Sequence, residues 1–349
     1  MSSEDDSILA LFDRQTVLKI SVGFVVALAI LWVLALSIGV ERILDALSTA
    51  RYEWLVLGCL STLACLTAWA KAWQVVLEVA GVRLRFRRLL VTFYAATFAN
   101  YVTPLGQAGG EPFIAYVLSR DTGASYEDSL ASVVTADALN LLPFFTFAGV
   151  GFGALLWNAA LPATAEPLAA GLVAMAIGVP IIALGGWYFR TRLKRLIVRL
   201  AAPVAKRTER ISLPSLRQRL HDLEAAFGRI ATDRKSLAVA LAFSYVGWIW
   251  FTMPLYFAGL AVGEHIDPLL VLFIVPASTL AGLTPSPGGL GGVEAALVGL
   301  LVALAGLSLP TAAAVAVIYR VASYVFALAV GALGVIAVIA RNGAVEKPG

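Results

Sequence analysis

Three long stretches of this chain are apolar and carry no charge, and they restrict the possible fold more than any other feature. They are Ile20–Val40, Pro167–Phe189 and Ser236–Gly263. Each reaches the roughly 18 apolar residues that a membrane-spanning α-helix requires. The whole chain is 60% hydrophobic and only 14% charged, whereas soluble domains carry about 25% charged residues. The sequence therefore predicts an all-α integral membrane protein.

Basic residues are concentrated in two segments of the chain. Residues 190–235 hold 13 of the 26 lysine and arginine residues against four acids, and Arg83, Arg85, Arg87 and Arg88 form a second cluster. In membrane proteins, connections rich in lysine and arginine lie on the cytoplasmic side. We therefore expect a multi-pass protein of the cell membrane with both segments and both termini in the cytoplasm. Anionic lipid of the inner leaflet would hold the basic connection 190–235 to the surface.

This orientation predicts about six full transmembrane helices and two broken stretches, arranged as two membrane repeats. In order, we expect a cytoplasmic tail at 1–16, helices at 17–40 and 54–80, a broken stretch at 86–119, helices at 127–157 and 167–189, the basic connection 190–235, a helix at 236–263, a second broken stretch at 268–306, a helix at 310–340 and a cytoplasmic tail at 341–349. The first repeat would span residues 17–157, and the second, inverted repeat would span residues 158–340.

Each broken stretch contains a Pro/Gly motif, YVTPLGQAGGEPF at 101–113 and LTPSPGGLGGVEAAL at 283–297. Divided there, each stretch leaves pieces of about 15 residues, which at about 1.5 Å per residue cross only part of a hydrocarbon core about 30 Å thick. We interpret each stretch as a re-entrant pair of half-helices, with four short, tilted spans as the alternative. The break residues are Thr103, Pro104, Gly109 and Gly110 in the first motif, and Thr284, Pro285, Pro287, Gly288, Gly289, Gly291 and Gly292 in the second.

The two broken stretches also resemble each other. A glutamate, Glu111 or Glu294, follows each glycine pair, and from that glutamate onward equivalent positions are displaced by 183 residues. The same displacement makes Asp137 equivalent to Arg320. Three crossings would separate the two stretches, so that the second copy would be inverted in the membrane. Inverted repeats with broken helices near the midplane are typical of alternating-access transporters.

Five ionisable side chains are expected at membrane depth, namely Lys71, Glu111, Asp137, Glu294 and Arg320. Each costs at least about 2.5–3.5 kcal/mol at the bilayer centre on insertion scales, and therefore needs a partner or a wet cavity. Asp137 would form an ion pair with Arg320, or Arg320 would meet an anionic headgroup. The two glutamates either favour helix N-termini through the helix dipole or serve proton coupling or headgroup contact. Lys71 either snorkels to the interface or attracts the phosphate group.

The sequence contains no arrangement typical of an enzyme or a metal site. It has no Ser–His–Asp set, phosphate loop, zinc spacing or nucleotide fingerprint. We therefore expect no catalytic residue, no cofactor and no metal. The basic connection indicates contact with a membrane surface and not with nucleic acid.

The break motifs and their flanks resemble those of one known family. The pattern is Asn100-x-x-Thr-Pro followed by Gly-Gly-Glu111, then Pro285-Ser-Pro-Gly-Gly-Leu-Gly-Gly-Val-Glu294, then Tyr319-Arg320. Over nearly the whole chain it resembles the flippase-like membrane family, also called the lysylphosphatidylglycerol synthase transmembrane region. In members the domain occurs alone, fused to a soluble lysyl-transferring domain, or joined to a glycosyltransferase. Here we expect the stand-alone membrane domain.

The resemblance implies that the protein moves an anionic or modified lipid between leaflets, for example an aminoacyl phospholipid or a polyprenyl-linked sugar. The expected lipid-contacting residues are Arg320, Lys71, Asn100, Asp137, Glu111 and Glu294. Members often carry a Glu-Arg pair near Ala136-Asp137, and this sequence lacks the arginine. Lys71 stands where members often have arginine, so the positive charge is kept.

We therefore expect a lipid flippase-like transporter that works by alternating access. Its partners would be membrane lipids with anionic headgroups, with a separate lipid-modifying enzyme or glycosyltransferase as a further candidate, and the oligomeric state is open. One alternative is an inverted-repeat secondary transporter of a small solute or ion. Another is a non-transporting membrane scaffold for a lipid-modifying enzyme, with 190–235 as its docking surface.

Overall fold

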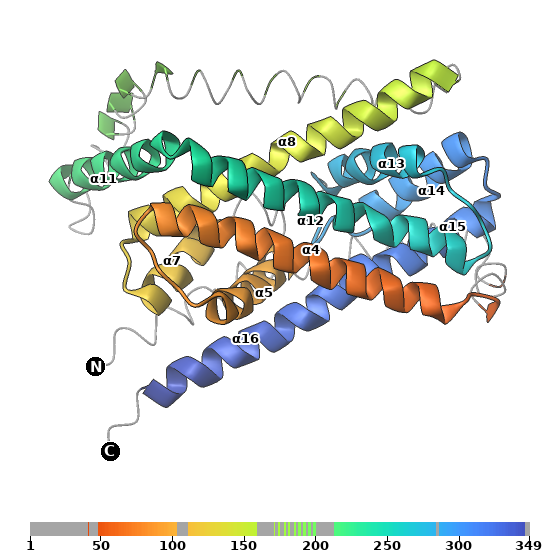
Figure 1. Cartoon of the computed structure of the whole chain (residues 1–349), viewed down its shortest axis with the longest axis horizontal. Coiled ribbons are helices and arrows are strands. Elements are labelled where there is room, and N and C mark those ends of the chain that lie inside the picture. The colour runs from red at the N-terminus through yellow and green to blue at the C-terminus, as the bar shows by residue number, and fades with distance from the viewer. Residues whose placement is uncertain are drawn as a thin grey trace.

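The computed structural model describes residues 48–102, 111–158, 213–283 and 286–345, together with Glu41 and isolated positions between 171 and 199. Over these residues the chain is all-helical (Figure 1). The predicted tail 1–16 and helix 17–40 lie outside the described residues, and only isolated positions are described in the predicted helix 167–189.

Four parts of the described chain are long and apolar enough to cross a membrane. They are α4 (Tyr52–Val79), Tyr126–Leu155 within α8 (Tyr126–Asn158), α12 (Arg234–Ala261), and Leu309–Val338. The last combines α15 (Leu309–Arg320), the π-helix η2 (Val321–Val325) and the first part of α16 (Phe326–Val345). These positions agree with four of the six predicted helices, and the π-helix was not anticipated.

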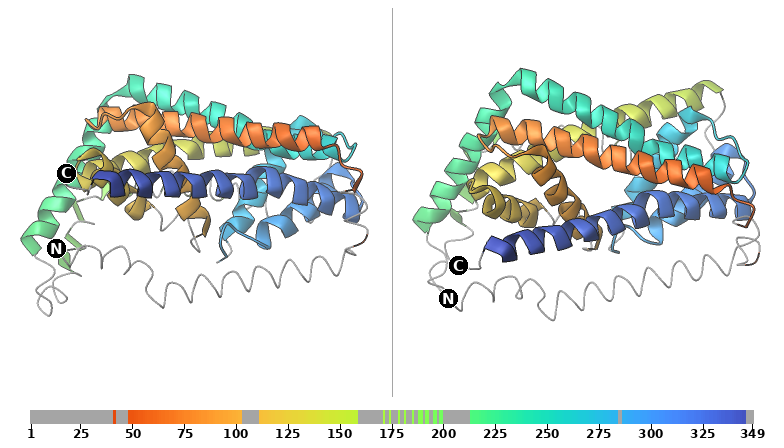
Figure 2. Two further views of the ribbon diagram at one scale, coloured as in Figure 1. Left: turned by 90° about the horizontal axis from the view of Figure 1, so that it is seen from below. Right: turned by 60° about the horizontal axis from the view of Figure 1, so that its bottom comes forward.

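Four shorter helices occupy the two broken stretches. The first helix pair consists of α5 (Phe86–Val102) and α7 (Glu111–Thr122), and the second consists of α13 (Pro268–Leu280) and α14 (Gly292–Ala305) with the short 3₁₀ helix η1 (Ala281–Leu283) between them. Each is shorter than the roughly 20 residues that a full crossing needs. The two pairs lie toward opposite ends of the long axis of the molecule (Figures 1 and 2).

Helices α4 and α12 run antiparallel along the middle of the molecule (Figure 1). The Arg51 N–H donates to Ala261 O at 2.8 Å, which joins the beginning of α4 to the end of α12. The Trp69 indole fills the space over Gly247, where a Cβ would lie 2.3 Å from Trp69 Cδ1. Small residues at helix contacts let backbones approach closely in a membrane, where apolar burial gives little driving force.

Glycines also set the packing of the short helices on the spans. Helix α5 packs on α16, where a Cβ on Gly334 would lie 2.8 Å from Ala95 N. Helix α13 packs on α8, where a Cβ on Gly151 would lie 2.6 Å from Phe273 N. Gly151 and Gly334 are themselves 183 residues apart. The first helix pair thus leans on the last span, and the second leans on α8.

The basic connection contains a helix, α11 (Leu213–Thr232), which the sequence analysis did not predict. Ala226 and Ile230 on one face of α11 are buried. On the other side, Arg229 pairs with Asp128, and Arg219 lies 3.7 Å from Glu127. Because both acids lie in the first turn of α8, α11 sits at the end of the molecule where α8 and α12 begin.

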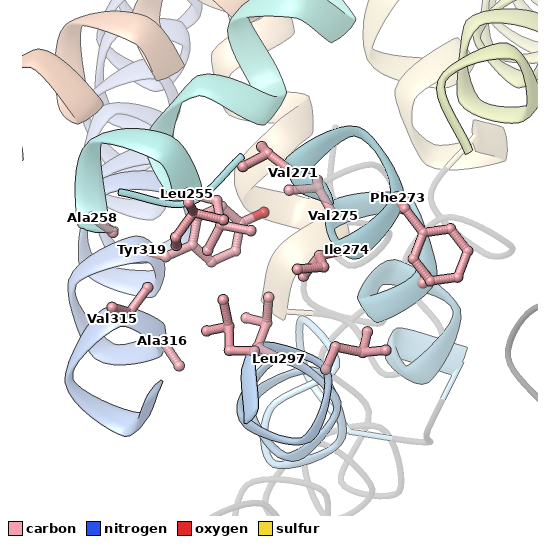
Figure 3. Close-up of a cluster of buried hydrophobic side chains, with 14 of the residues drawn as sticks. Leu255, Ala258, Val271, Phe273, Ile274, Val275, Leu297, Val315, Ala316 and Tyr319 are labelled. Carbon is pink, nitrogen blue, oxygen red and sulfur yellow. The ribbon is translucent and has the colours of Figure 1, made fainter. Parts of the chain in front are cut away.

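Two apolar clusters hold the helices together. One gathers residues of α4, α5, α7, α8 and α11 around the first helix pair. The other joins α8, α12, α13, α14 and α15, and Figure 3 shows Leu255, Ile274, Leu297 and Tyr319 of this cluster facing one another. Tyr319 directly precedes Arg320, so this second core fixes the end of α15 from which the Arg320 side chain extends.

Candidate functional site

The candidate site is centred on Arg320, the last residue of α15. Its Nε donates to Glu294 Oε1 at 2.5 Å, and its Nη2 donates to Gly288 O at 3.1 Å. The side chains of Arg320 and Glu294 are only 13% and 9% exposed. A buried arginine needs a charge partner and filled hydrogen bonds, and the turn before α14 supplies both. We call Arg320, Glu294, Gly288 and Tyr324 the arginine site.

Glu294 is held in place by the beginning of its own helix. It lies in the first turn of α14, and its Oε2 accepts a hydrogen bond from the Gly291 N–H at 2.6 Å. The positive end of the helix dipole favours a carboxylate at this position. One oxygen of Glu294 therefore caps the helix while the other faces Arg320, so the predicted helix-terminus role and a charge-pairing role occur together.

The turn that leads into α14 can be built only with glycine at two positions. Gly288 and Gly289 have φ of +59° and +66°, which disfavour residues with a Cβ. A Cβ on Gly288 would lie 2.1 Å from Tyr324 Cε2, and one on Gly289 would lie 2.5 Å from Gly282 Cα. The turn consequently packs directly against Tyr324 and presents the Gly288 carbonyl to Arg320.

Tyr324 completes the site and connects it to the first helix pair. The Arg320 Cζ lies 4.3 Å from the centre of the Tyr324 ring, within the range of a cation–π interaction. The Tyr324 and Tyr101 ring centres are 5.1 Å apart, and the Tyr324 hydroxyl donates a long hydrogen bond of 3.4 Å to Tyr101 O. Since Tyr101 lies in the last turn of α5, the end of the first helix pair reaches the arginine site.

The equivalent positions in the first half carry no such pair. Asp137 accepts a hydrogen bond from Trp73 Nε1 at 3.2 Å and lies within electrostatic reach of Glu111, the first residue of α7. Within the part of the chain that the structure describes, neither Asp137 nor Glu111 forms an ion pair. The predicted ion pair between Asp137 and Arg320 is therefore wrong. Arg320 pairs instead with Glu294, which comes from the helix that precedes α15 in the chain.

Lys71 and Asn100 lie apart from the arginine contacts. The Lys71 Nζ donates to Gln74 Oε1 at 2.7 Å and lies 5.3 Å from the centre of the Phe86 ring. Lys71 thus belongs to the junction between α4 and α5. The Asn100 Oδ1 is buried, and among the described residues it has no hydrogen-bond partner.

Several predicted break residues cannot be placed in this site. Thr103, Pro104, Gly109, Gly110, Thr284 and Pro285 lie outside the described residues. Pro287, Gly288, Gly289, Gly291 and Gly292 form the turn before α14 and its first residue. In the described ranges, no three His, Cys, Asp or Glu side chains gather closely enough to hold a metal ion.

Sequence reasoning missed two residues that contact Arg320 or its helix. Tyr324 could have been found, because residues four apart on a helix lie on the same face. Thr62 could not, because its contact is with a main-chain atom of a distant helix, the carbonyl of Ala322.

The sequence was compared with known proteins and protein families. Residues 20–331 match the family described as the lysylphosphatidylglycerol synthase transmembrane region. A UPF0104 membrane protein of Methanothermobacter thermautotrophicus is 25% identical over 351 residues, covering 96% of this chain and 98% of the relative. A UPF0104 membrane protein of Pyrococcus horikoshii is 23% identical over 320 residues, covering 88% of this chain and 92% of the relative.

Proposed function

Since this chain belongs to the lysylphosphatidylglycerol synthase transmembrane region family, we propose that it is a flippase-like transporter of lipids. It would move a lipid with an anionic or modified headgroup, such as an aminoacyl phospholipid or a polyprenyl-linked sugar, between the leaflets. The observation that carries the proposal is the buried Arg320 beside a turn built from glycine. Ionisable residues within membrane-spanning segments are costly and typically mark substrate pathways.

The arginine site has the chemistry to receive a phosphate group. A guanidinium binds phosphate and carboxylate oxygens through the same fork of N–H donors. Glu294 occupies that fork in this structure, so an arriving phosphate would replace the Glu294 carboxylate as the partner of Arg320. The glutamate would keep its bond to the Gly291 N–H, and the lipid tails would stay in the bilayer. Lys71, at the other end of α4, would offer a second positive charge on the headgroup path.

We further propose that the membrane domain consists of two inverted repeats, residues 17–157 and 158–340, that exchange access between the two sides. Three observations support this. A displacement of 183 residues carries Tyr126, the start of α8, onto Leu309, the start of α15. The packing of α5 on α16 has its counterpart in the packing of α13 on α8. The two helix pairs also lie toward opposite ends of the molecule (Figure 1), as re-entrant hairpins entering from opposite faces would.

The end of the molecule that carries α11 would face the cytoplasm of a multi-pass cell-membrane protein. Exposed Arg217 and Lys235 lie in and just after α11, and the exposed Arg83 and Arg85 follow α4 at the same end. This is the side on which arginine and lysine accumulate in membrane proteins. The chain would end there too, because α16 runs toward this end (Figure 1).

Lipid exchange in vesicles tests the proposal. Purified protein is reconstituted with fluorescent anionic lipids, and the labelled lipid that becomes accessible to an external quencher is followed with time. We expect exchange well above that of protein-free vesicles, and a loss of about tenfold or more in Arg320→Ala, since one lost charged contact is worth about 1.5–3 kcal/mol. Arg217→Ala, on the exposed side of α11, is the matched control and should keep the full rate.

Two results would replace the lipid proposal with another. Wild-type exchange equal to that of protein-free vesicles, across several headgroups, would rule out a lipid transporter. Counterflow of a small solute or ion under those conditions would then favour the solute transporter. Copurification of a lipid-modifying enzyme that depends on residues 190–235 would favour the scaffold.

A further inference from the structure

Two adjacent side chains of α4 donate to main-chain oxygens that two other helices leave without a helical donor. In α12, residue 254 is proline, which has no N–H, so the carbonyl four residues earlier loses its donor. That carbonyl belongs to Trp250, and Ser61 Oγ donates to it at 2.6 Å. Ser61 is only 2% exposed, so water cannot take its place.

The second acceptor lies in the π-helix after Arg320. The Phe326 N–H donates to Val321 O, one residue farther back than in an α-helix, so Ala322 O lacks its usual donor. Thr62 Oγ1 donates to Ala322 O at 2.9 Å, and Thr62 is 5% exposed. A Cβ on Gly58, one turn earlier in α4, would lie 2.9 Å from Ala322 Cβ. Gly58 therefore gives the π-helix room to approach α4.

We propose that Thr62 is a positioning residue for Arg320. Arg320 directly precedes the π-helix, so the hydrogen-bond pattern of residues 321–325 fixes the direction of its side chain. Without the Thr62 hydroxyl, Ala322 O regains a donor only if the Phe326 N–H returns to it and the segment becomes α-helical. Removing one residue from that turn rotates α15 against α16 by about 100°. This rotation takes Arg320 away from Glu294 and from the Gly288 carbonyl.

The test compares variants that differ in one hydroxyl group. Thr62→Val removes the donor with little change of shape, and Thr62→Ser keeps a hydroxyl group. Thr67→Val is the matched control on the same helix, because Thr67 Oγ1 donates to Leu63 O within α4 itself. The first readout is the rate at which phenylglyoxal modifies Arg320 in the purified protein, followed by peptide mass spectrometry. The second is the lipid concentration that gives half-maximal exchange.

In Thr62→Val we expect Arg320 to be modified about tenfold faster, because a buried carbonyl left without a donor costs about 1–3 kcal/mol. The half-maximal lipid concentration should rise by a similar factor. Thr62→Ser should behave as the wild type in both readouts. Equal modification rates in Thr62→Val and Thr67→Val would overturn the proposal. If Thr62→Val does not purify as a folded protein, Thr62→Ala removes the same donor without crowding the π-helix and is judged by the same comparison.

The exchange readout rests on the proposed lipid transport, whereas the modification readout does not. If the wild-type protein moves no lipid, the phenylglyoxal rates still decide whether Thr62 positions Arg320. If the wild type moves lipid while Thr62→Val leaves the modification rate unchanged, the transport proposal stands and the role of Thr62 is refuted.

Discussion

The second half of the molecule closes its charged position with an ion pair, whereas the first half leaves two acids near each other. Glu294 and Arg320 are 2.5 Å apart at their nearest atoms, and both side chains are buried. At the equivalent positions, Glu111 and Asp137 carry the same sign of charge, and Asp137 has the Trp73 indole as its hydrogen-bond donor. Similar helices in similar places thus support opposite electrostatics.

This difference shows that the related backbone does not determine the charge of the site. In both halves a short helix begins beside a glutamate and is followed by a long span. The chemistry is set by one position of the span, aspartate on α8 and arginine on α15. If the protein moves an anionic headgroup, the two halves contribute unequally, because Arg320 attracts the phosphate and Asp137 repels it.

The largest effect is expected from removing the cation of the second half. Arg320→Ala leaves the buried Glu294 without a counter-charge, and breaking a buried pair in this way costs about 3–5 kcal/mol. We expect a correspondingly large drop in the midpoint of thermal unfolding in detergent. Arg320→Met combined with Glu294→Gln removes both charges and should regain part of the loss. A drop no larger than that of Asp137→Ala would remove the contrast between the halves.

A smaller effect is expected from filling the glycine turn of the second half. In Gly288→Ala the Cβ overlaps the Tyr324 ring and the backbone keeps φ near +59°, so we expect a loss of about 2 kcal/mol. Gly306→Ala is the control, because Gly306 has φ of +67° with nothing within 4 Å of its Cβ. It should show only the left-handed backbone cost of about 1 kcal/mol. Equal midpoints in chemical unfolding would mean that the turn does not press on Tyr324.

An effect of opposite sign is expected in the first half. Asp137→Asn keeps an oxygen that can accept the Trp73 hydrogen bond and removes a negative charge from the neighbourhood of Glu111. Because burying an unpaired charge is unfavourable, the substitution should stabilise the protein, by about 1 kcal/mol. The measurement is again the thermal midpoint, at neutral pH. A destabilised Asp137→Asn would show that the aspartate has an attractive partner and that the halves are more alike than described.

The smallest effect concerns a cap that only one of two equivalent helices has. Asp233 Oδ1 accepts the Ser236 N–H at 3.0 Å at the start of α12, whereas Arg51 makes no side-chain cap at the start of α4. The bond from the Ser236 N–H, followed by that from its hydroxyl, holds the pKa of Asp233 below its ordinary value. The cap therefore contributes fully above the unfolded-state pKa of about 3.9 and is lost as the pH falls through the folded-state pKa.

Hydrogen exchange in the first turn of α12 measures this cap. At pH 7, Asp233→Ala should exchange faster there than the wild type, and Asp233→Asn should stay close to the wild type because asparagine also caps helices. In acid, the wild type and Asp233→Ala should converge. Unchanged exchange in Asp233→Ala at pH 7 would mean that the packing of α12 on α4 alone holds the helix end.

The helices that cross or enter the membrane could be predicted because their apolar length is a local property of the sequence. The predicted helix 236–263 is found at Arg234–Ala261, and the predicted stretch 268–306 is found as α13, η1 and α14. Helix α11 was missed, although Leu216, Leu220, Leu223 and Phe227 recur at helical spacing, because attention went to its arginines. The π-helix has no local signal, since its pattern depends on a donor in another helix.

The residues of the arginine site could be predicted, but not their partner. The repeat made Asp137 equivalent to Arg320 and so favoured an ion pair across the molecule. A repeat relates positions without saying which atoms meet, and the short connection between α14 and α15 brings Glu294 to Arg320 first. Tyr324 and Thr62 act through a ring face and a main-chain oxygen, and neither leaves a charge pattern in the sequence.

Ser61 and Thr62 have a consequence for how mutations spread through such a protein. Both hydroxyl groups act on carbonyl oxygens, which every residue type possesses. No compensating exchange in α12 or α16 can therefore restore a hydroxyl lost from α4, and statistical covariation between pairs of positions would not detect the contact. The two helices depend on a dipeptide whose importance would be visible only as intolerance to substitution at residues 61 and 62.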